Sequence, residues 1–209
     1  MNDCIESIMY KGFSIDIYQD ECFESPREWE NLGTMVCFHR RYSLGDKHEF
    51  SDSDDFREYL DENENKIMAL PLYLYDHGGI TMNTTGFSCP WDSGQVGVIY
   101  CTYEKIRKEY GIKYVTKKWQ EKIRQYLINE VQTYDQYLRG EVYCYNIEDT
   151  VDSCGGFYGY DHKKSGLLEY ARSAIDYEIK DRKAKHAEQL KQWIKAKVPL
   201  QYRTPLQIV

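Results

Sequence analysis

IMALPLYLYDHGGITMNTTGFSCPWDSGQVGVIYC, residues 67–101, alternates short apolar runs with glycine-rich and polar segments. The apolar runs are too short for helices and are bounded by turn residues, which predicts three strands: 67–75, 80–82 and 96–101. Gly78 and Gly79 indicate a tight turn between the first two strands, and Pro71 indicates an edge or a bulge. Residues 84–94 are expected to form a long loop, the kind of segment in which binding and catalytic residues concentrate.

The rest of the chain supplies further strands and four helices. Alternating apolar and polar residues predict strands over 10–18, 34–40, 141–147 and 153–160. Apolar residues at three-to-four spacing and capping residues predict helices over 54–63, 102–110, 117–138 and 166–197. Strands and helices do not alternate one by one, which disfavours a parallel sheet built from βαβ units. We therefore predict an α+β fold, with a mixed, mostly antiparallel sheet, helices on one face and a long C-terminal helix.

A length of 209 residues fits one domain with a core of its own. We predict a single α+β domain over residues 1–179. The apolar stripe of the last helix thins from Lys180, and the segment Lys180–Lys197 carries seven Lys and Arg against two acids. Residues 180–209 are therefore predicted to form a basic C-terminal helical extension that projects from the core or docks on a partner.

Composition and the cysteine pattern predict a soluble protein of the cytoplasm. The start of the chain has no basic region followed by an apolar stretch, so no secretion signal is expected. No apolar run approaches the ~20 residues of a membrane helix, so no membrane association is expected. The seven cysteines are scattered singly, without a CxxC pair, which fits reduced thiols.

The net charge of −7 is unevenly distributed. Between His48 and Glu64 there are eight acids and one basic residue, Arg57. This segment is either a solvated helix face or a surface that imitates nucleic acid and binds a basic partner. We expect binding residues here and in segment 72–97: Asp52, Asp54, Asp55, Glu58, Trp91 and Gln95. Eight Lys and Arg in residues 105–124 leave nucleic-acid binding as an alternative, which the acidic balance of the chain does not favour.

The segment 72–97 also carries residues suited to catalysis. The candidates are Asp76, His77, Cys89 and Asp92. Cys89 is the candidate nucleophile, with His77 or His39 as its base, because a thiolate needs an imidazole within hydrogen-bond reach. The residues expected to orient the base or stabilise an oxyanion are Asp76, Asp92 and Gln95. Pro90 follows Cys89 and has no N–H, so the backbone of the next residue cannot donate to an oxyanion.

A metal site is a second interpretation of these side chains. Cys37 and His39 lie two residues apart on a predicted strand and point to one face, with His77 and Cys89 as further ligands. Structural zinc sites use ligand pairs separated by two to four residues, and only one pair here comes close to that spacing. Phosphate-binding motifs of the GxxxxGK[ST] and GxGxxG types are absent. We therefore predict no metal and no cofactor.

Several longer motifs carry a resemblance to known proteins. They are SPREWENLGTM (25–35), CFHRRY (37–42), LGD (44–46), LPLYLYDHGG…TTGFSCPWDSGQVG (70–97) and CGGFYGYD (154–161). The chain resembles, over most of residues 8–178, a family of uncharacterised proteins encoded by bacteriophages and mobile elements. No activity is established for that family, so the resemblance carries over no functional residues.

The resemblance implies a small phage protein made in the cytoplasm of a bacterial host. Accessory proteins of this kind often bind and disable host machinery, including restriction and CRISPR nucleases. We expect a binding protein whose partner is a host or phage protein, such as a defence nuclease. Two alternatives stay open: a hydrolase centred on 72–97 that depends on Cys and His or on a metal, and an accessory protein of phage DNA metabolism.

Overall fold

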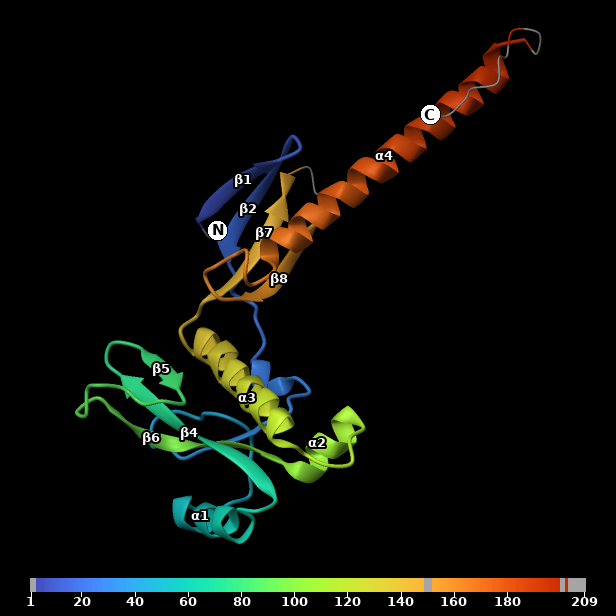
Figure 1. Cartoon of the computed structure of the whole chain (residues 1–209). Helices are drawn as coiled ribbons and strands as arrows, with labels where there is room; N and C mark the ends of the chain where they lie inside the picture. The colour runs from blue at the N-terminus through green and yellow to red at the C-terminus, as the bar shows by residue number, and fades with distance from the viewer. Residues whose placement is uncertain (1–2, 149–151, 200–201, 203–209) are drawn as a thin grey trace. The chain divides into compact units, whose positions relative to one another are not determined.

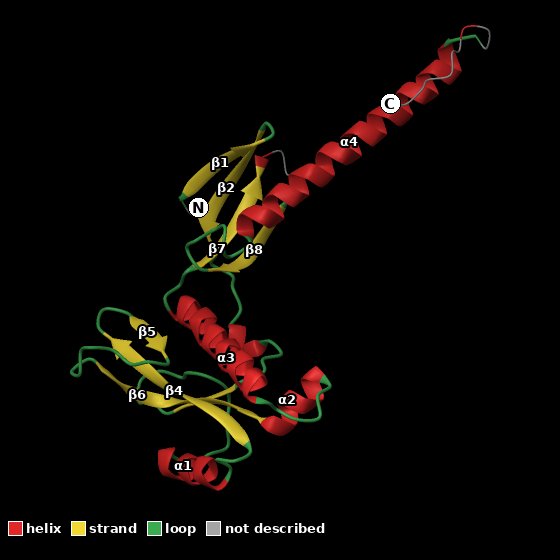
Figure 2. Ribbon diagram, in the orientation of Figure 1, coloured by secondary structure: helices red, strands yellow, loops and turns green. Residues whose placement is uncertain are grey.

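The computed structural model describes residues 3–148, 152–199 and 202. These residues form two four-stranded sheets and four α-helices (Figures 1 and 2). Contacts divide the chain into two compact units, each with its own core. The central unit contains Glu21–Val142 and Tyr158–Tyr160; the terminal unit contains Met1–Asp20, Tyr143–Phe157 and Asp161–Val209. Residues 1–179 contribute to both units.

The sheet of the central unit has the order β3-β6-β4-β5, and its pairs are antiparallel. Its strands are β3 (Thr34–Cys37), β4 (Ile67–Asp76), β5 (Ile80–Asn83) and β6 (Ser93–Thr102). β4 and β6 pair along almost their whole lengths, with Ile67 opposite Thr102 at one end. Pro71 itself stays in register opposite Val98, and the register shifts between Leu72 and Tyr73, so the predicted bulge lies near this proline and not at it.

One face of this sheet packs against α2 (Tyr103–Tyr110) and α3 (Lys117–Leu138). On β4 the core positions alternate, as expected for a strand with one face buried: Met68, Leu70, Leu72 and Leu74. On α3 the buried positions recur every three to four residues: Ile123, Leu127, Val131 and Tyr134. Thr102 caps α2 by accepting a hydrogen bond from the Lys105 amide, and Gly111 ends it with a φ of 61°. Both helices therefore begin and end where the sequence predicts.

α1 (Ser53–Glu62) lies on the other side of this sheet (Figure 1). Phe56 and Tyr59 of α1 contact the ring of Tyr100, with ring centroids 5.9 and 5.7 Å away. Tyr100 alternates along β6 with Ile99, a member of the core that includes α3, so the two side chains point to opposite faces. The expected placement of helices on one face therefore holds for α2 and α3 but not for α1.

The terminal unit contains the sheet β1-β2-β7-β8. Its strands are β1 (Glu6–Tyr10), β2 (Phe13–Gln19), β7 (Val142–Ile147) and β8 (Ser153–Tyr158). The predicted single strand over 10–18 is wrong, because Lys11 and Gly12 turn the chain with φ values of 49° and 89°. Two consecutive positive φ values form the tight turn of a hairpin, which pairs Tyr10 with Phe13. The predicted turn between β7 and β8 falls partly outside the described residues.

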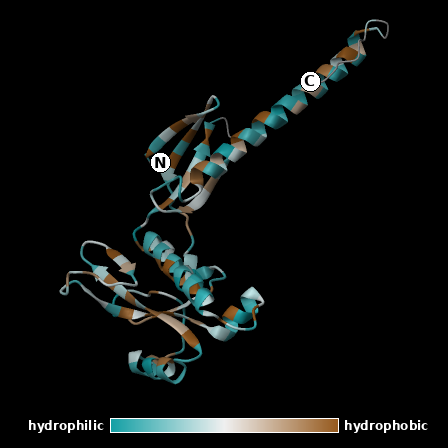
Figure 3. Ribbon diagram, in the orientation of Figure 1, coloured by the Kyte–Doolittle hydropathy of each residue, from teal (hydrophilic) through white to brown (hydrophobic). Residues whose placement is uncertain are grey.

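α4 (Leu167–Lys197) is the predicted long C-terminal helix. Its first part packs on the terminal sheet through buried side chains: Leu167, Leu168, Ala171 and Ile175. From Arg182 to Trp193 every residue is exposed, Leu190 by 45% and Trp193 by 58%. Figure 3 shows that this part of the helix is mostly hydrophilic. The predicted boundary between residues 179 and 180 thus falls inside a continuous helix, close to the point where its burial ends.

The α+β class, the antiparallel pairing and the long C-terminal helix are confirmed. The number of sheets differs from the prediction, because the strands form two antiparallel sheets instead of one mixed sheet. The second sheet depends on a pairing between β2 and β7, in which Ile15 lies opposite Ile147. Hydrophobic alternation predicts that both segments are strands, but it does not predict such distant partners.

A buried ion-pair network joins the segment before β3 to α3. The Arg27 side chain is 5% exposed and donates from Nε and Nη2 to the two carboxylate oxygens of Asp46, at 2.8 and 2.7 Å. Its Nη1 donates to Glu130 of α3 at 3.0 Å. Glu130 is 10% exposed and also accepts from the backbone amides of Leu32 and Gly33, at 2.9 and 3.1 Å. Each of these buried charges is therefore both paired and hydrogen-bonded.

We expect Glu130→Ala to lower the free energy of unfolding by about 3–5 kcal/mol, because Arg27 and two backbone amides lose a buried partner. Urea unfolding measures the change. Glu121→Ala removes an exposed carboxylate from the same helix and is the matched control, with an expected change within about 0.5 kcal/mol. Equal effects of the two substitutions would contradict a structural role for the network.

The two parts of α4 are expected to differ in their contribution to stability. Ile175→Ala removes a fully buried side chain and is expected to cost about 2–5 kcal/mol. Leu190→Ala removes an exposed side chain from the same helix, and we expect a change within about 0.5 kcal/mol. Thermal and urea unfolding followed by helical circular dichroism compare the two variants. A large loss for Leu190→Ala would show that this side chain is buried in solution.

Candidate functional site

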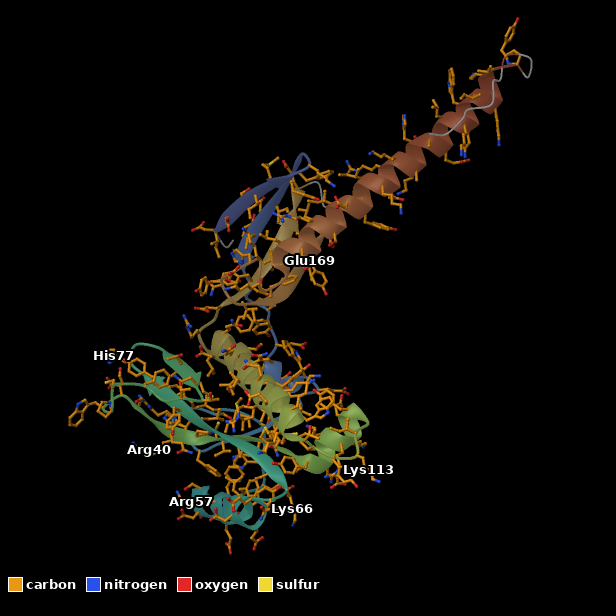
Figure 4. All side chains as sticks on the ribbon, in the orientation of Figure 1. Arg40, Arg57, Lys66, His77, Lys113 and Glu169 are labelled. Atoms are coloured by element: carbon orange, nitrogen blue, oxygen red, sulfur yellow. The ribbon has the colours of Figure 1, made fainter. Side chains whose placement is uncertain are left out.

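The structure brings the four candidate catalytic residues together beside the ends of β4 and β6. The backbone amide of Asp76 donates to the carbonyl oxygen of Asp92 at 2.9 Å. Asp92 Oδ2 lies 3.3 Å from His77 Nδ1 and accepts from Cys89 Sγ at 3.6 Å. The thiol and the imidazole therefore lie within about 7 Å of each other. Figure 4 labels His77, which follows the end of β4 on the exposed surface.

These contacts differ from those of a cysteine nucleophile, whose thiol hydrogen-bonds to the base that activates it. The carboxylate of Asp92 contacts both other groups, and the described side chains of Cys89 and His77 do not hydrogen-bond each other. A reactive thiolate needs positive charge beside it, whereas this thiol faces a carboxylate. Asp76 forms an ion pair with Arg41 and accepts from the Tyr42 hydroxyl at 3.3 Å. The residues predicted to act together are thus close, but they are not arranged for cysteine catalysis.

His39 and Gln95 make contacts of another kind. His39 Nδ1 accepts from the backbone amides of Arg41 and Tyr42, both at 3.3 Å. Its ring stacks on that of Tyr42, with centroids 5.0 Å apart. The side-chain amide of Gln95 donates to the carbonyl oxygen of Gly97 in the same strand at 3.3 Å. These contacts hold a loop and a strand in place, and none of them involves Cys89.

The metal hypothesis depended on Cys37 and His39 sharing a strand face. β3 ends at Cys37, whose side chain belongs to the buried core, so the two residues do not form the expected pair. In the described part of the chain, no three His, Cys, Asp or Glu side chains are placed to hold a metal ion. Burial raises the pKa of the Cys37 thiol to about 12 and that of the Cys101 thiol to about 11.

The acidic segment forms α1, and part of its charge stabilises the helix itself. Asp52 is the N-cap and accepts from the amides of Asp54 and Asp55, at 2.9 and 3.0 Å. The helix predicted over 54–63 would be capped by Ser53; the structure places the cap one residue earlier, and Asp and Ser are equally good caps. Asp55 accepts from the amide and the hydroxyl of Ser51, at 3.0 and 3.2 Å. Asp52 and Asp55 therefore have structural roles that a test of binding must leave intact.

The four acids that follow Arg57 in this segment are exposed, and we call them the carboxylate face. Its members are Glu58, Asp61, Glu62 and Glu64. Arg57 is the one basic residue within α1, and its guanidinium lies 3.7 Å from Asp54, on the first turn. Figure 4 labels Arg57 on α1. The described structure shows no ion pair between the carboxylate face and a basic side chain, so its negative charge is available to a partner.

Aromatic packing fixes α1 to the sheet. Phe56 is buried and contacts Phe50, with ring centroids 4.7 Å apart. Phe50 also contacts Tyr59 of α1 at 5.3 Å and His48 at 5.9 Å. His48 in turn contacts Phe38, just after β3, at 4.9 Å. The helix that carries the carboxylate face is thus anchored by several rings, which holds its acids in a defined position.

Trp91 is the most exposed large hydrophobic side chain of those described, with 92% of its surface accessible. Its loop is held by the Ser93 hydroxyl, which donates to the carbonyl oxygen of Cys89 at 2.5 Å. Tryptophan is enriched among the residues that dominate protein–protein binding energy. A fixed loop that presents a tryptophan to solvent supports a binding role for this segment.

Comparisons with protein-family models, with curated proteins and with solved structures find no match to this chain. The resemblance to phage proteins therefore stays a prediction. Among the described residues, no helix combines the length and the apolar character needed to cross a bilayer. The function must therefore be argued from the surface of the molecule.

The thiols offer a direct test of this geometry. We expect iodoacetamide at pH 8 to modify the exposed thiols of Cys4, Cys22 and Cys154 at least about 100-fold faster than Cys37 and Cys101, which burial protects. Mass spectrometry of digests at successive times gives each rate, and urea should remove the difference.

The same experiment examines Cys89. Because Cys89 and His77 do not hydrogen-bond each other, His77→Ala is expected to change the labelling rate of Cys89 by less than about twofold. A large fall in that rate would show that the imidazole activates the thiol, and it would restore the hydrolase hypothesis.

Proposed function

We propose that this chain is a phage-type accessory protein that acts by binding another protein, and that the carboxylate face of α1 makes the contact. The partner we propose is a host or phage protein with a basic surface. In its specific form, the partner is a nucleic-acid-targeting defence enzyme, such as a restriction or CRISPR nuclease. Its basic cleft would receive the carboxylates of α1 where it otherwise receives phosphates.

The observation that carries this proposal is the position of the acids on α1. Asp61 and Glu62 lie in the last turn, which contains no basic residue. The C-terminal end of a helix carries partial negative charge, so carboxylates there lower the stability of the helix. Glu58 and Glu62 are also four residues apart, and like charges at that spacing repel. Carboxylates at these positions lower the stability of the free chain, and a basic partner that binds them would offset this cost.

Two further features support a binding role. The aromatic anchor of α1 fixes the carboxylates before a partner arrives, which lowers the entropic cost of association. Trp91 offers an apolar contact of the kind that dominates protein interfaces. The hydrolase alternative has weaker support, because Asp92 rather than His77 contacts the Cys89 thiol.

The proposal predicts that a triple reversal, Glu58→Lys, Asp61→Lys and Glu62→Lys, weakens binding without weakening the fold. We expect the free energy of unfolding to stay equal or to rise by about 0.3–1 kcal/mol, because the helix end gains favourable charge. The tagged protein is expressed in a bacterium, and captured proteins are identified by mass spectrometry. A protein captured in stoichiometric amount by the original chain should be lost from the variant.

A matched control carries the same change in charge elsewhere on the central unit: Glu104→Lys, Glu109→Lys and Glu121→Lys. These residues are exposed on α2 and α3, so capture should persist. Double-stranded DNA should compete for the captured protein, and added salt should weaken the complex. Capture that survives reversal of the carboxylate face, or that DNA does not reduce, would contradict the proposal.

A further inference from the structure

We propose that the hollow formed by residues 37–48 binds a phosphate group, carried either by a small molecule or by a nucleic-acid backbone. This hollow has a volume of about 710 Å³ and lies in the central unit, where it is lined by the end of β3 and the loop that follows it, as far as His48. Its basic lining residues are His39, Arg40, Arg41, Lys47 and His48. The site does not use the carboxylate face, so this inference does not depend on the proposed function.

The basic groups of the hollow are available to an anion. Arg40 and Lys47 are exposed, and neither forms an ion pair with any described residue. Figure 4 labels Arg40 on the side of the central unit that faces away from α3. Arg41 forms an ion pair with Asp76, so less of its positive charge is available to a ligand than that of Arg40 or Lys47. A guanidinium and an ammonium are the groups that proteins most often present to phosphate oxygens.

The one acid that lines the hollow does not compete for the ligand. Asp46 accepts from Nε and Nη2 of Arg27 and from the amide of Met35 at 2.8 Å. Both carboxylate oxygens of Asp46 therefore already accept hydrogen bonds, and Arg27, which it shares with Glu130, offsets part of its charge. Without these donors, a carboxylate beside Lys47 would repel an anion more strongly. The electrostatic character of the hollow follows from the pairing of Arg27.

His39 adds a hydrogen-bond donor to the hollow, and His48 contributes a buried nitrogen without a partner. His39 Nδ1 accepts from two backbone amides, so the neutral ring carries its proton on Nε2, which is a donor. His48 Nε2 lies 3.3 Å from the carbonyl oxygen of Cys37 and must donate, since a carbonyl oxygen only accepts. His48 Nδ1 is buried without a hydrogen-bond partner in the described structure.

The loop around the hollow is held in shape before any ligand binds. At its start, the amide of Phe38 donates to the carbonyl oxygen of Val96 at 2.7 Å. At its end, Gly45 pairs with Val36 in an isolated β-bridge, and its amide donates to the Tyr134 hydroxyl at 2.9 Å. Fixing both ends reduces the conformational entropy that ligand binding would otherwise remove. The geometry thus combines a hollow, free positive charge and a preorganised backbone.

The test is a titration of the isotope-labelled full chain with sodium phosphate, with sodium chloride added to hold the ionic strength constant. We expect the amide resonances of residues 39–48 to shift in a saturable way. Arg40→Ala combined with Lys47→Ala should weaken the affinity for phosphate about tenfold or more, because charge-assisted contacts are lost. Both residues are exposed, so the fold should persist.

The control variant removes the same charge from exposed positions outside the hollow, by Arg107→Ala and Lys113→Ala. Its affinity should stay within twofold of the original. A mononucleotide and a short oligothymidylate then distinguish the source: affinity that rises with length and falls steeply with salt indicates a nucleic-acid backbone, and equal affinity indicates a small phosphorylated molecule. The proposal is overturned if phosphate causes no saturable shift in residues 39–48, or if both variants weaken binding equally.

Discussion

The buried guanidinium of Arg27 is the constraint on which much of the central unit depends. A charge that is 5% exposed is stable only if its donors are satisfied, and Asp46, Glu130 and the carbonyl oxygen of Gly33 together satisfy them. Asp46 lies in the loop 37–48 and Glu130 lies on α3, so the Arg27 side chain fixes the segments on both sides of β3 against a helix. Removing Arg27 leaves two carboxylates without their cationic partner, and removing either carboxylate leaves part of the guanidinium without an acceptor.

Two glycines show how closely that network packs. A Cβ atom on Gly33 would lie 2.6 Å from the Leu127 side chain of α3 and 2.8 Å from that of Ile99 in β6. Gly45 has a φ of 73°, a conformation that side chains rarely adopt. The motifs SPREWENLGTM and LGD, which contain Arg27, Gly33, Gly45 and Asp46, are therefore explained by structure. These four residues support the fold.

Structure that depends on neighbouring residues could be predicted from the sequence, but pairing between distant strands and side chains could not. α2 and α3 follow from capping residues and apolar spacing, which act within a few positions. The hairpin of β1 and β2 was missed because Lys11 adopts a positive φ, which is rare for a residue other than glycine. The proximity of His77, Cys89 and Asp92 was predicted from one loop-rich segment, but Asp92 contacts both of the others, a detail that only side-chain positions reveal. The partners of Arg27 likewise come from separate elements.

The contrast between buried and exposed charge supports the two proposed binding sites. At Arg27 each charged group has an oppositely charged, hydrogen-bonded partner inside the fold, so the network has a structural explanation. On α1, carboxylates occupy the helix end that disfavours them, and in the loop 37–48, Arg40 and Lys47 lack acidic partners among the described residues. Folding alone favours neither arrangement, because each concentrates charge of one sign. The buried charges of the central unit are thus paired, whereas two exposed surfaces of opposite sign carry charges without partners among the described residues. Binding of an oppositely charged partner would add stability at each of these surfaces.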